Sequence, residues 1–203
     1  MKENTEKLIY KNKIMENKLH FVAISGSLRK ESYNTKVLKT IQKLARENIS
    51  IEQLFIDDVP LYNVDLYEKN FPESVEKVCK SIKNSDGLII VTPEYNYSIP
   101  GVLKNVIDFI STHPSKPFDK KVVGIISAST SLLGGIRAQF HLRQILVAVN
   151  TTTLNFPEIA ITQVNKKFDN TGNLTDDTAK TLLEKFISEL TNVAIAKINI
   201  DKF

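Results

Sequence analysis

Two polar stretches of this chain, residues 26–34 and 92–98, carry the residue types best suited to ligand chemistry. The first, GSLRKESYN, supplies the candidate phosphate ligands Ser27, Arg29, Ser32 and Asn34. Gly26 allows a sharp turn without a Cβ clash, and the arginine fork matches phosphate oxygens. Asn34 stands at the expected N-cap of a helix whose first amides add positive potential. The stretch therefore predicts a phosphate site, although a capped surface turn would have a similar composition.

The second stretch, TPEYNYS, combines aromatic and hydrogen-bonding groups, with Pro93, Glu94, Tyr95 and Asn96 as candidate ligands. Its backbone amides could reach the pyrimidine edge of a flavin ring while Tyr95 packs against the ring, and a rigid surface turn is the alternative. A third stretch, residues 127–135, adds hydroxyls and glycines. A ligand with a phosphate bound at one stretch and an aromatic ring bound at another would be a mononucleotide, and we favour a flavin.

Other chemistries lack their motifs. Neither GxGxxG nor a Gly-Lys-Ser/Thr phosphate loop is present, which argues against a Rossmann NAD site and against an ATPase. Glu94 has no evident histidine or second carboxylate beside it, so we assign it no acid or base role. His20, His113 and His141 are scattered without metal-ligand spacing. We therefore predict no catalytic side chain and no metal site.

Periodicity indicates which elements must position these stretches. Apolar runs predict strands at residues 19–25, 50–56, 87–91, 121–128 and 151–155. Helical patterns occupy residues 35–47, 72–84, 102–110, 136–149 and 176–196, and residues 57–71 form an irregular loop. This alternation predicts a three-layer α/β sandwich with a flavodoxin-like five-stranded parallel sheet, in the order 2-1-3-4-5. All three polar stretches then lie at the carboxyl edge of the sheet, where such folds bind ligands.

Composition limits the remaining possibilities. The 203 residues predict one flavodoxin-like domain at 18–203, preceded by a polar extension at 1–17. The net charge is +4, but no basic stripe is interleaved with aromatic residues, so we expect no nucleic-acid partner. No apolar run is long enough for a membrane span, and no secretion signal is evident. Cys79 is the only cysteine, and its helical apolar register predicts a buried core residue. We expect a cytoplasmic protein.

Together, these stretches resemble the NADPH-dependent FMN reductase family, which includes quinone, chromate and azo-dye reductases of flavodoxin-like fold. The resemblance rests on residues 26–34, on TPEYNYSIPGVLKNVID at 92–108, and on GGIR at 134–137 with HLRQ at 141–144. It implies that Arg29, Ser32 and Asn34 hold the FMN phosphate with Ser27 beside them. It also implies that residues 93–96 contact the ring and that Ser129 closes the site. Glu31 departs from a position that is often glycine in the family.

The resemblance implies an FMN-dependent NAD(P)H oxidoreductase that passes hydride through FMN to quinones, flavins, azo compounds or similar small acceptors in a ping-pong cycle. NADPH and NADH would both serve, and the protein would be a homodimer that could pair into a homotetramer. One alternative is a flavodoxin-like electron carrier that does not oxidise NAD(P)H. The basic charge disfavours it, because such carriers usually present an acidic face. The other alternative is a flavin-free α/β interaction protein.

Overall fold

The computed structural model describes residues 18–67 and 70–200. The strands are β1 (Leu19–Ser25), β2 (Ile49–Leu54), β3 (Gly87–Thr92), β4 (Val122–Ala128), β5 (Thr152–Thr153) and β6 (Ile159–Ile161). The helices are α2 (Tyr33–Leu44), α3 (Val64–Tyr67), α4 (Glu73–Asn84), α5 (Gly101–Thr112), α6 (Ile136–Ala148) and α7 (Asp177–Ile200), with a 3-10 turn at Val164–Lys166. The predicted extension, residues 1–17, lies outside the described residues.

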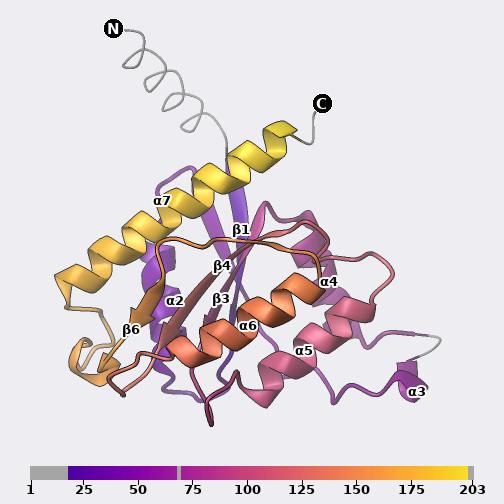
Figure 1. The fold of residues 1–203 in the computed structure, drawn as a ribbon, viewed down its shortest axis with the longest axis horizontal. Helices are drawn as coiled ribbons and strands as arrows, with labels where there is room; N and C mark the ends of the chain where they lie inside the picture. Colours follow the sequence, from indigo (N-terminus) through magenta and orange to yellow (C-terminus); the bar gives the residue numbers. More distant parts are fainter. Residues whose placement is uncertain (1–17, 68–69, 201–203) are drawn as a thin grey trace, which may run out of the picture.

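The strands form one parallel sheet in the order β2-β1-β3-β4-β5, which confirms the flavodoxin-like prediction (Figure 1). The position beside β4 is shared by two short strands. β5 pairs with Val122 and Val123, whereas β6 pairs with β4 from Ile126 to Ala128. The sequence pattern predicts only the strand at residues 151–155 and not β6, because a three-residue strand is too short to show a period.

Two apolar cores sandwich the sheet, one on each face. Alternate residues of β1 illustrate this, since Phe21 and Ala23 join the core under α2 and α7 while Val22 and Ile24 join the core under α4, α5 and α6. Figure 1 shows α5 and α6 together on one side of the strands. The alternation follows from the period of two along a strand and produces the predicted three layers.

Helix boundaries differ from the prediction at several places. α2 begins at Tyr33, two residues early, because Ser32 is its N-cap and Asn34 already lies inside the first turn. α7 continues to Ile200, and the short helix α3 lies within the predicted irregular loop. Among residues 18–67 and 70–200, no helix has the combination of length and apolar character that crossing a membrane requires.

Gly124 is required where α7 packs on β4. A Cβ at this position would collide with the Phe186 ring and lie 3.2 Å from Leu190 Cδ1. We expect Gly124→Ala to lower the free energy of unfolding by about 1–3 kcal/mol, since overpacking a full core forces side chains and backbone to shift. Gly101→Ala is the control, because its Cβ would meet nothing within 4 Å. Urea denaturation showing equal effects for both variants would contradict this account of the packing.

Candidate functional site

The first loop, residues 26–34, follows β1 and begins beside the start of the second loop, residues 92–98. Gly26 donates from its backbone N–H to Val91 O at 2.8 Å, and a Cβ on Gly26 would lie 2.9 Å from Thr92 Oγ1. The glycine is therefore needed for a close approach between two loops, in addition to the turn predicted from sequence. As a result, the predicted phosphate and ring stretches lie side by side at the carboxyl edge of the sheet.

Ser32 and Ser27 shape this first loop. Ser32 Oγ accepts from Thr35 N at 3.4 Å, and Ser32 N donates to Arg29 O at 3.1 Å. Ser27 is buried, and its Oγ accepts from Arg29 N at 3.4 Å. The prediction that Asn34 is the N-cap is wrong, because Ser32 has that role. The first amides of α2 have no acceptor within the helix and suit an anion.

Asn34 is a clamp between α2 and β4. Its Nδ2 donates to Ala128 O and its Oδ1 accepts from Ala128 N, both at 3.1 Å. The residue is 4% exposed. Both polar atoms of the Asn34 side chain are therefore hydrogen-bonded within the protein. Its backbone N–H is the group that an anion at the N-terminus of α2 could reach.

The Arg29 side chain is exposed, and within the described part of the chain its guanidinium has no ion-pair partner. Glu31, the departure noted in the sequence, pairs instead with Lys36 Nζ at 2.9 Å. This hydrogen bond and the nearby positive charge lower the pKa of the Glu31 carboxyl. Because Lys36 compensates Glu31, the loop keeps an uncommitted cation beside the N-terminus of α2, as a phosphate site requires.

The second loop is a tight two-residue turn. Tyr95 and Ser98 exchange backbone hydrogen bonds of 2.9 and 3.0 Å, and Asn96 and Tyr97 both have positive φ values, 48° and 68°. Positive φ at both central positions is the geometry of a type I′ turn. Pro93 is buried, whereas Tyr95 is 45% exposed. The turn therefore presents an exposed aromatic ring on a backbone of fixed shape.

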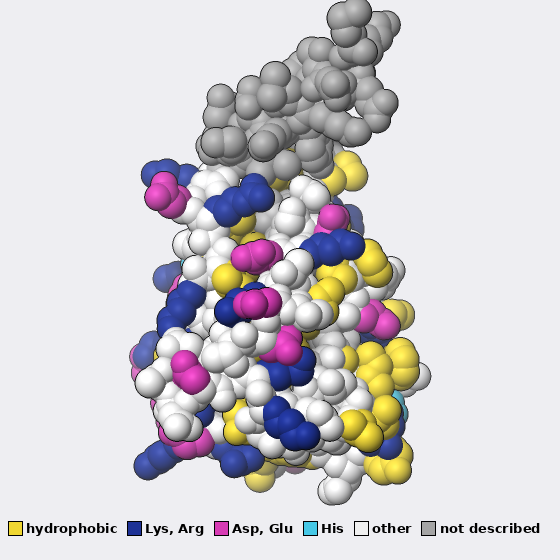
Figure 2. All heavy atoms as spheres, turned by 90° about the vertical axis from the view of Figure 1, so that its left-hand side faces the viewer, with side chains coloured by type: hydrophobic (Ala, Val, Ile, Leu, Met, Phe, Trp, Pro, Cys, Tyr) yellow, Lys and Arg dark blue, Asp and Glu magenta, His cyan; other side chains and the backbone are white. Residues whose placement is uncertain are grey.

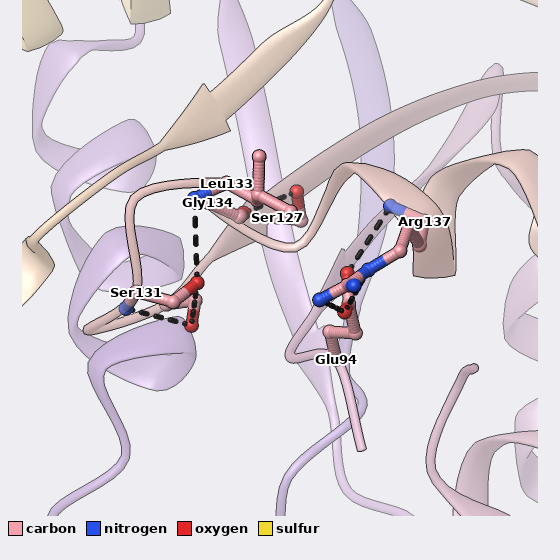
Figure 3. Close-up of polar contacts among 7 residues, drawn as sticks. Glu94, Ser127, Ser131, Leu133, Gly134 and Arg137 are labelled. Atoms are coloured by element: carbon pink, nitrogen blue, oxygen red, sulfur yellow. Dashed lines mark hydrogen bonds and ion pairs between the residues drawn. The ribbon is translucent and has the colours of Figure 1, made fainter. Parts of the chain in front are cut away.

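Glu94 anchors this loop to α6. Glu94 Oε1 accepts from Arg137 Nε at 2.6 Å, and Oε2 accepts from Arg137 N at 3.1 Å (Figure 3). The Arg137 guanidinium also lies 3.7 Å from the centre of the Tyr97 ring. The hydrogen bond to Glu94 is the largest cause that raises the pKa of Arg137. Both carboxylate oxygens are occupied and the Glu94 side chain is 8% exposed, so it acts as an anchor in this structure.

The third loop, residues 129–135, is fixed at both ends. Ser129 N donates to Ile161 O at 3.0 Å, and Ser129 Oγ contacts Ser131 Oγ at 3.1 Å. At the other end, Ser127 Oγ donates to Gly134 O at 2.7 Å (Figure 3). Gly135, with φ of 89°, is the N-cap of α6. The loop thus holds Ser129 at the same sheet edge as the other two loops.

The structure therefore brings all the predicted site residues to one edge of the sheet, on or beside the three loops that follow β1, β3 and β4. These candidates are Ser27, Arg29, Ser32, Asn34, Pro93, Glu94, Tyr95, Asn96 and Ser129. Arg137 is a residue that the site prediction missed. Its position in the GGIR motif was the available signal, but its pairing with Glu94 spans 43 positions and depends on the fold.

Other reactive groups lie elsewhere or are engaged. Burial raises the pKa of the Cys79 thiol to about 12, and the residue belongs to the core, as predicted. His141 Nδ1 lies 3.0 Å from Ser98 Oγ. Within residues 18–67 and 70–200, no group of three His, Cys, Asp or Glu side chains is arranged to hold a metal ion.

A parallel sheet of this order, with polar loops at its carboxyl edge, defines a flavodoxin-like fold, and folds of this kind bind their ligands at that edge. The family model of the NADPH-dependent FMN reductases matches residues 19–166. The chain belongs to this family, and it is therefore an oxidoreductase of the class that uses FMN and NAD(P)H.

Individual relatives agree with this assignment. An NAD(P)H-dependent FMN reductase of Pseudomonas aeruginosa is 43% identical over 87% of this chain and 95% of its own length. A quinone reductase of Escherichia coli is 44% identical over 80% of this chain and 88% of its own. Among solved structures, the flavoenzyme NAD(P)H:(acceptor) oxidoreductase FerB of Paracoccus denitrificans aligns with a TM-score of 0.81 at 32% identity, covering 88% of this chain and 98% of FerB.

Proposed function

We propose that this protein oxidises NAD(P)H and passes the electrons to quinones or similar small acceptors in a ping-pong cycle. FMN, when bound, supplies the group that accepts hydride and later gives it up. The observation that carries the proposal is the uncommitted Arg29 guanidinium beside the first turn of α2, on the same sheet edge as the exposed Tyr95 ring. Phosphate and ring can then be held at once by two adjacent loops.

Each part of the site has a separate task in this proposal. Arg29 and the first amides of α2 hold the phosphate, with Ser27 and Ser32 shaping the loop around it. The turn at residues 95–98 presents Tyr95 and its backbone amides to the ring, while the third loop places Ser129 beside it. No side chain has to gain or lose a proton, which fits the full engagement of Glu94 with Arg137.

Steady-state kinetics of the FMN-loaded protein test the proposal. We expect NAD(P)H oxidation to depend on added quinone and double-reciprocal plots at several quinone concentrations to be parallel, because each substrate occupies the ring face in turn. Intersecting lines would reject the ping-pong order. Tight FMN binding without NAD(P)H oxidation would instead support the alternative, an electron carrier.

The preference of the protein between NADPH and NADH should depend on the exposed positive charge near the site. Lys104 Nζ is held by Asp108 at 2.7 and 2.8 Å, which leaves the exposed Lys30 as the more available cation near the site. We expect both cofactors to work, with kcat/KM for NADPH about two- to five-fold higher at low salt and the difference shrinking as salt rises. Lys30→Ala should remove the difference, whereas Lys39→Ala on the exposed side of α2 should not. A preference for NADH, or a salt-independent preference for NADPH, would contradict this reading.

We further propose that the protein is a homodimer, which could pair into a homotetramer, with α6 at the interface. Gln139, on the inner face of α6, is fully buried. The exposed face of α6 instead carries Phe140, His141, Gln144 and Val147, with Phe140 51% and Val147 77% exposed. Figure 2 shows hydrophobic side chains gathered on the side of the molecule where α6 lies.

Light scattering tests this association. We expect a mass of at least twice the 22.9 kDa chain, and Phe140→Arg should shift it toward the monomer because a buried unpaired charge is costly. Leu182→Arg, at a position 41% exposed on α7, is the control and should leave the mass unchanged. A monomer mass for the unmodified protein at micromolar concentrations would rule out the proposal.

A further inference from the structure

The buried face of α6 carries one polar residue, Gln139, where its neighbours Ala138, Leu142 and Leu146 are apolar. Gln139 is 0% exposed. A buried amide without partners is costly, so its hydrogen bonds indicate what it does in the fold.

The Gln139 amide joins β4 to β6. Its Nε2 donates to Ser127 Oγ and to Ile159 O, both at 2.8 Å. The same Ser127 hydroxyl donates a hydrogen bond to Gly134 O at 2.7 Å (Figure 3). A continuous chain of hydrogen bonds therefore runs from the interior of α6 to the last turn of the third loop.

Close packing leaves no room for a side chain at Gly134 or Gly135, which lie beside this series of hydrogen bonds. A Cβ on Gly134 would lie 2.8 Å from the carbonyl carbon of Ala160, the residue after Ile159. A Cβ on Gly135 would lie 2.9 Å from Ser127 Cβ and 3.7 Å from Glu94 N. The end of the third loop is thus packed closely against β6 and Ser127, and the second loop lies next to it. A shift of Ser127 or Ile159 would therefore displace the end of the third loop, at the proposed ring site.

We propose that Gln139 is a positioning residue for the flavin ring, acting through Ser127 and Gly134 on the third loop. This inference rests on the proposed function, since it assigns Gln139 to the ring end of the same site. Gln139 does not contact the ligand in this account. The buried Gln139 Oε1 has no hydrogen-bond partner in the described structure, so the amide is held only through its NH₂ group. An apolar side chain of similar size would therefore fill the space and remove both hydrogen bonds that Gln139 donates, to Ser127 and to Ile159.

Flavin binding measured by fluorescence titration tests the inference. We expect Gln139→Met to raise the Kd of FMN and of riboflavin by the same factor, about ten-fold, because the ring and not the phosphate loses its support. Ser127→Ala, a smaller change that removes the middle of the chain, should act in the same direction. The double variant should lose little more than either single variant, since both break one connection.

Gln42→Met is the matched control. Gln42 Nε2 donates to Ile51 O at 2.9 Å and so makes the same kind of helix-to-strand bond between α2 and β2, away from the third loop. It should lower Tm without changing the riboflavin Kd. The inference is overturned if Gln139→Met and Ser127→Ala lower Tm but leave the riboflavin Kd unchanged, or if their effects simply add. Failure of the unmodified protein to bind any flavin would instead overturn the proposed function, and this inference with it.

Discussion

Replacing Arg29 by alanine is expected to weaken FMN binding by about one to two orders of magnitude and to leave riboflavin binding nearly unchanged. Only FMN carries the phosphate, and a hydrogen bond to a charged group contributes roughly 1.5–3 kcal/mol. The Arg29 side chain is exposed and has no ion-pair partner among the described residues, so the unliganded protein should lose little stability. The measurement is the Kd of each flavin by fluorescence titration.

Arg46→Ala is the matched control for Arg29→Ala. Arg46 is also exposed, but it lies between α2 and β2, near the amino edge of the sheet, where a phosphate at the first loop would not reach it. Its removal should change neither Kd. Equal losses for FMN and riboflavin in Arg29→Ala would show that Arg29 supports the fold of the loop and does not read the phosphate.

Asn34→Ala is expected to destabilise the flavin-free protein by roughly 2–4 kcal/mol. The change leaves both the N–H and the C=O of Ala128 without their partner at a buried position, and each such group costs about 1–3 kcal/mol. The free energy of unfolding in urea measures the loss. If stability is unchanged and only FMN affinity falls, the Asn34 side chain serves the phosphate directly, as the resemblance implies.

Asn105 provides a comparison of the same chemistry. Its Oδ1 accepts from Tyr62 N and its Nδ2 donates to Pro60 O, both at 2.8 Å. Asn105→Ala therefore breaks an identical two-bond clamp at a half-buried position. Water can replace the lost partners more easily there, so the loss should be smaller than for Asn34→Ala.

Features governed by local pattern were predictable from the sequence. The apolar runs at β1, β3 and β4 have strong periodicity and few alternatives, so the sheet order and the common edge of the loops followed from them. The N-cap of α2 was misplaced because Ser32 and Asn34 are both good capping residues, and only the bond from Thr35 N distinguishes them. β6 was missed because Ile159–Ile161 is held by its pairing with β4 and not by a local pattern.

The contacts that join the loops could not be read from the chain. Asn34 meets Ala128 across 94 positions, and Glu94 meets Arg137 across 43. Residue types alone identified both side chains as polar groups near a ligand. Only the fold shows that each is bonded within the protein, which moves their expected role from direct ligand to support of the site.

An anaerobic titration of the FMN-loaded protein tests the central claim most directly. We expect NADPH to bleach the flavin absorbance with a stoichiometry of about one equivalent per bound FMN, because hydride transfer carries two electrons, and a quinone added afterwards to restore it. A bound flavin that dithionite bleaches but NADPH does not would show that the protein is not an NAD(P)H oxidoreductase, and it would contradict the account.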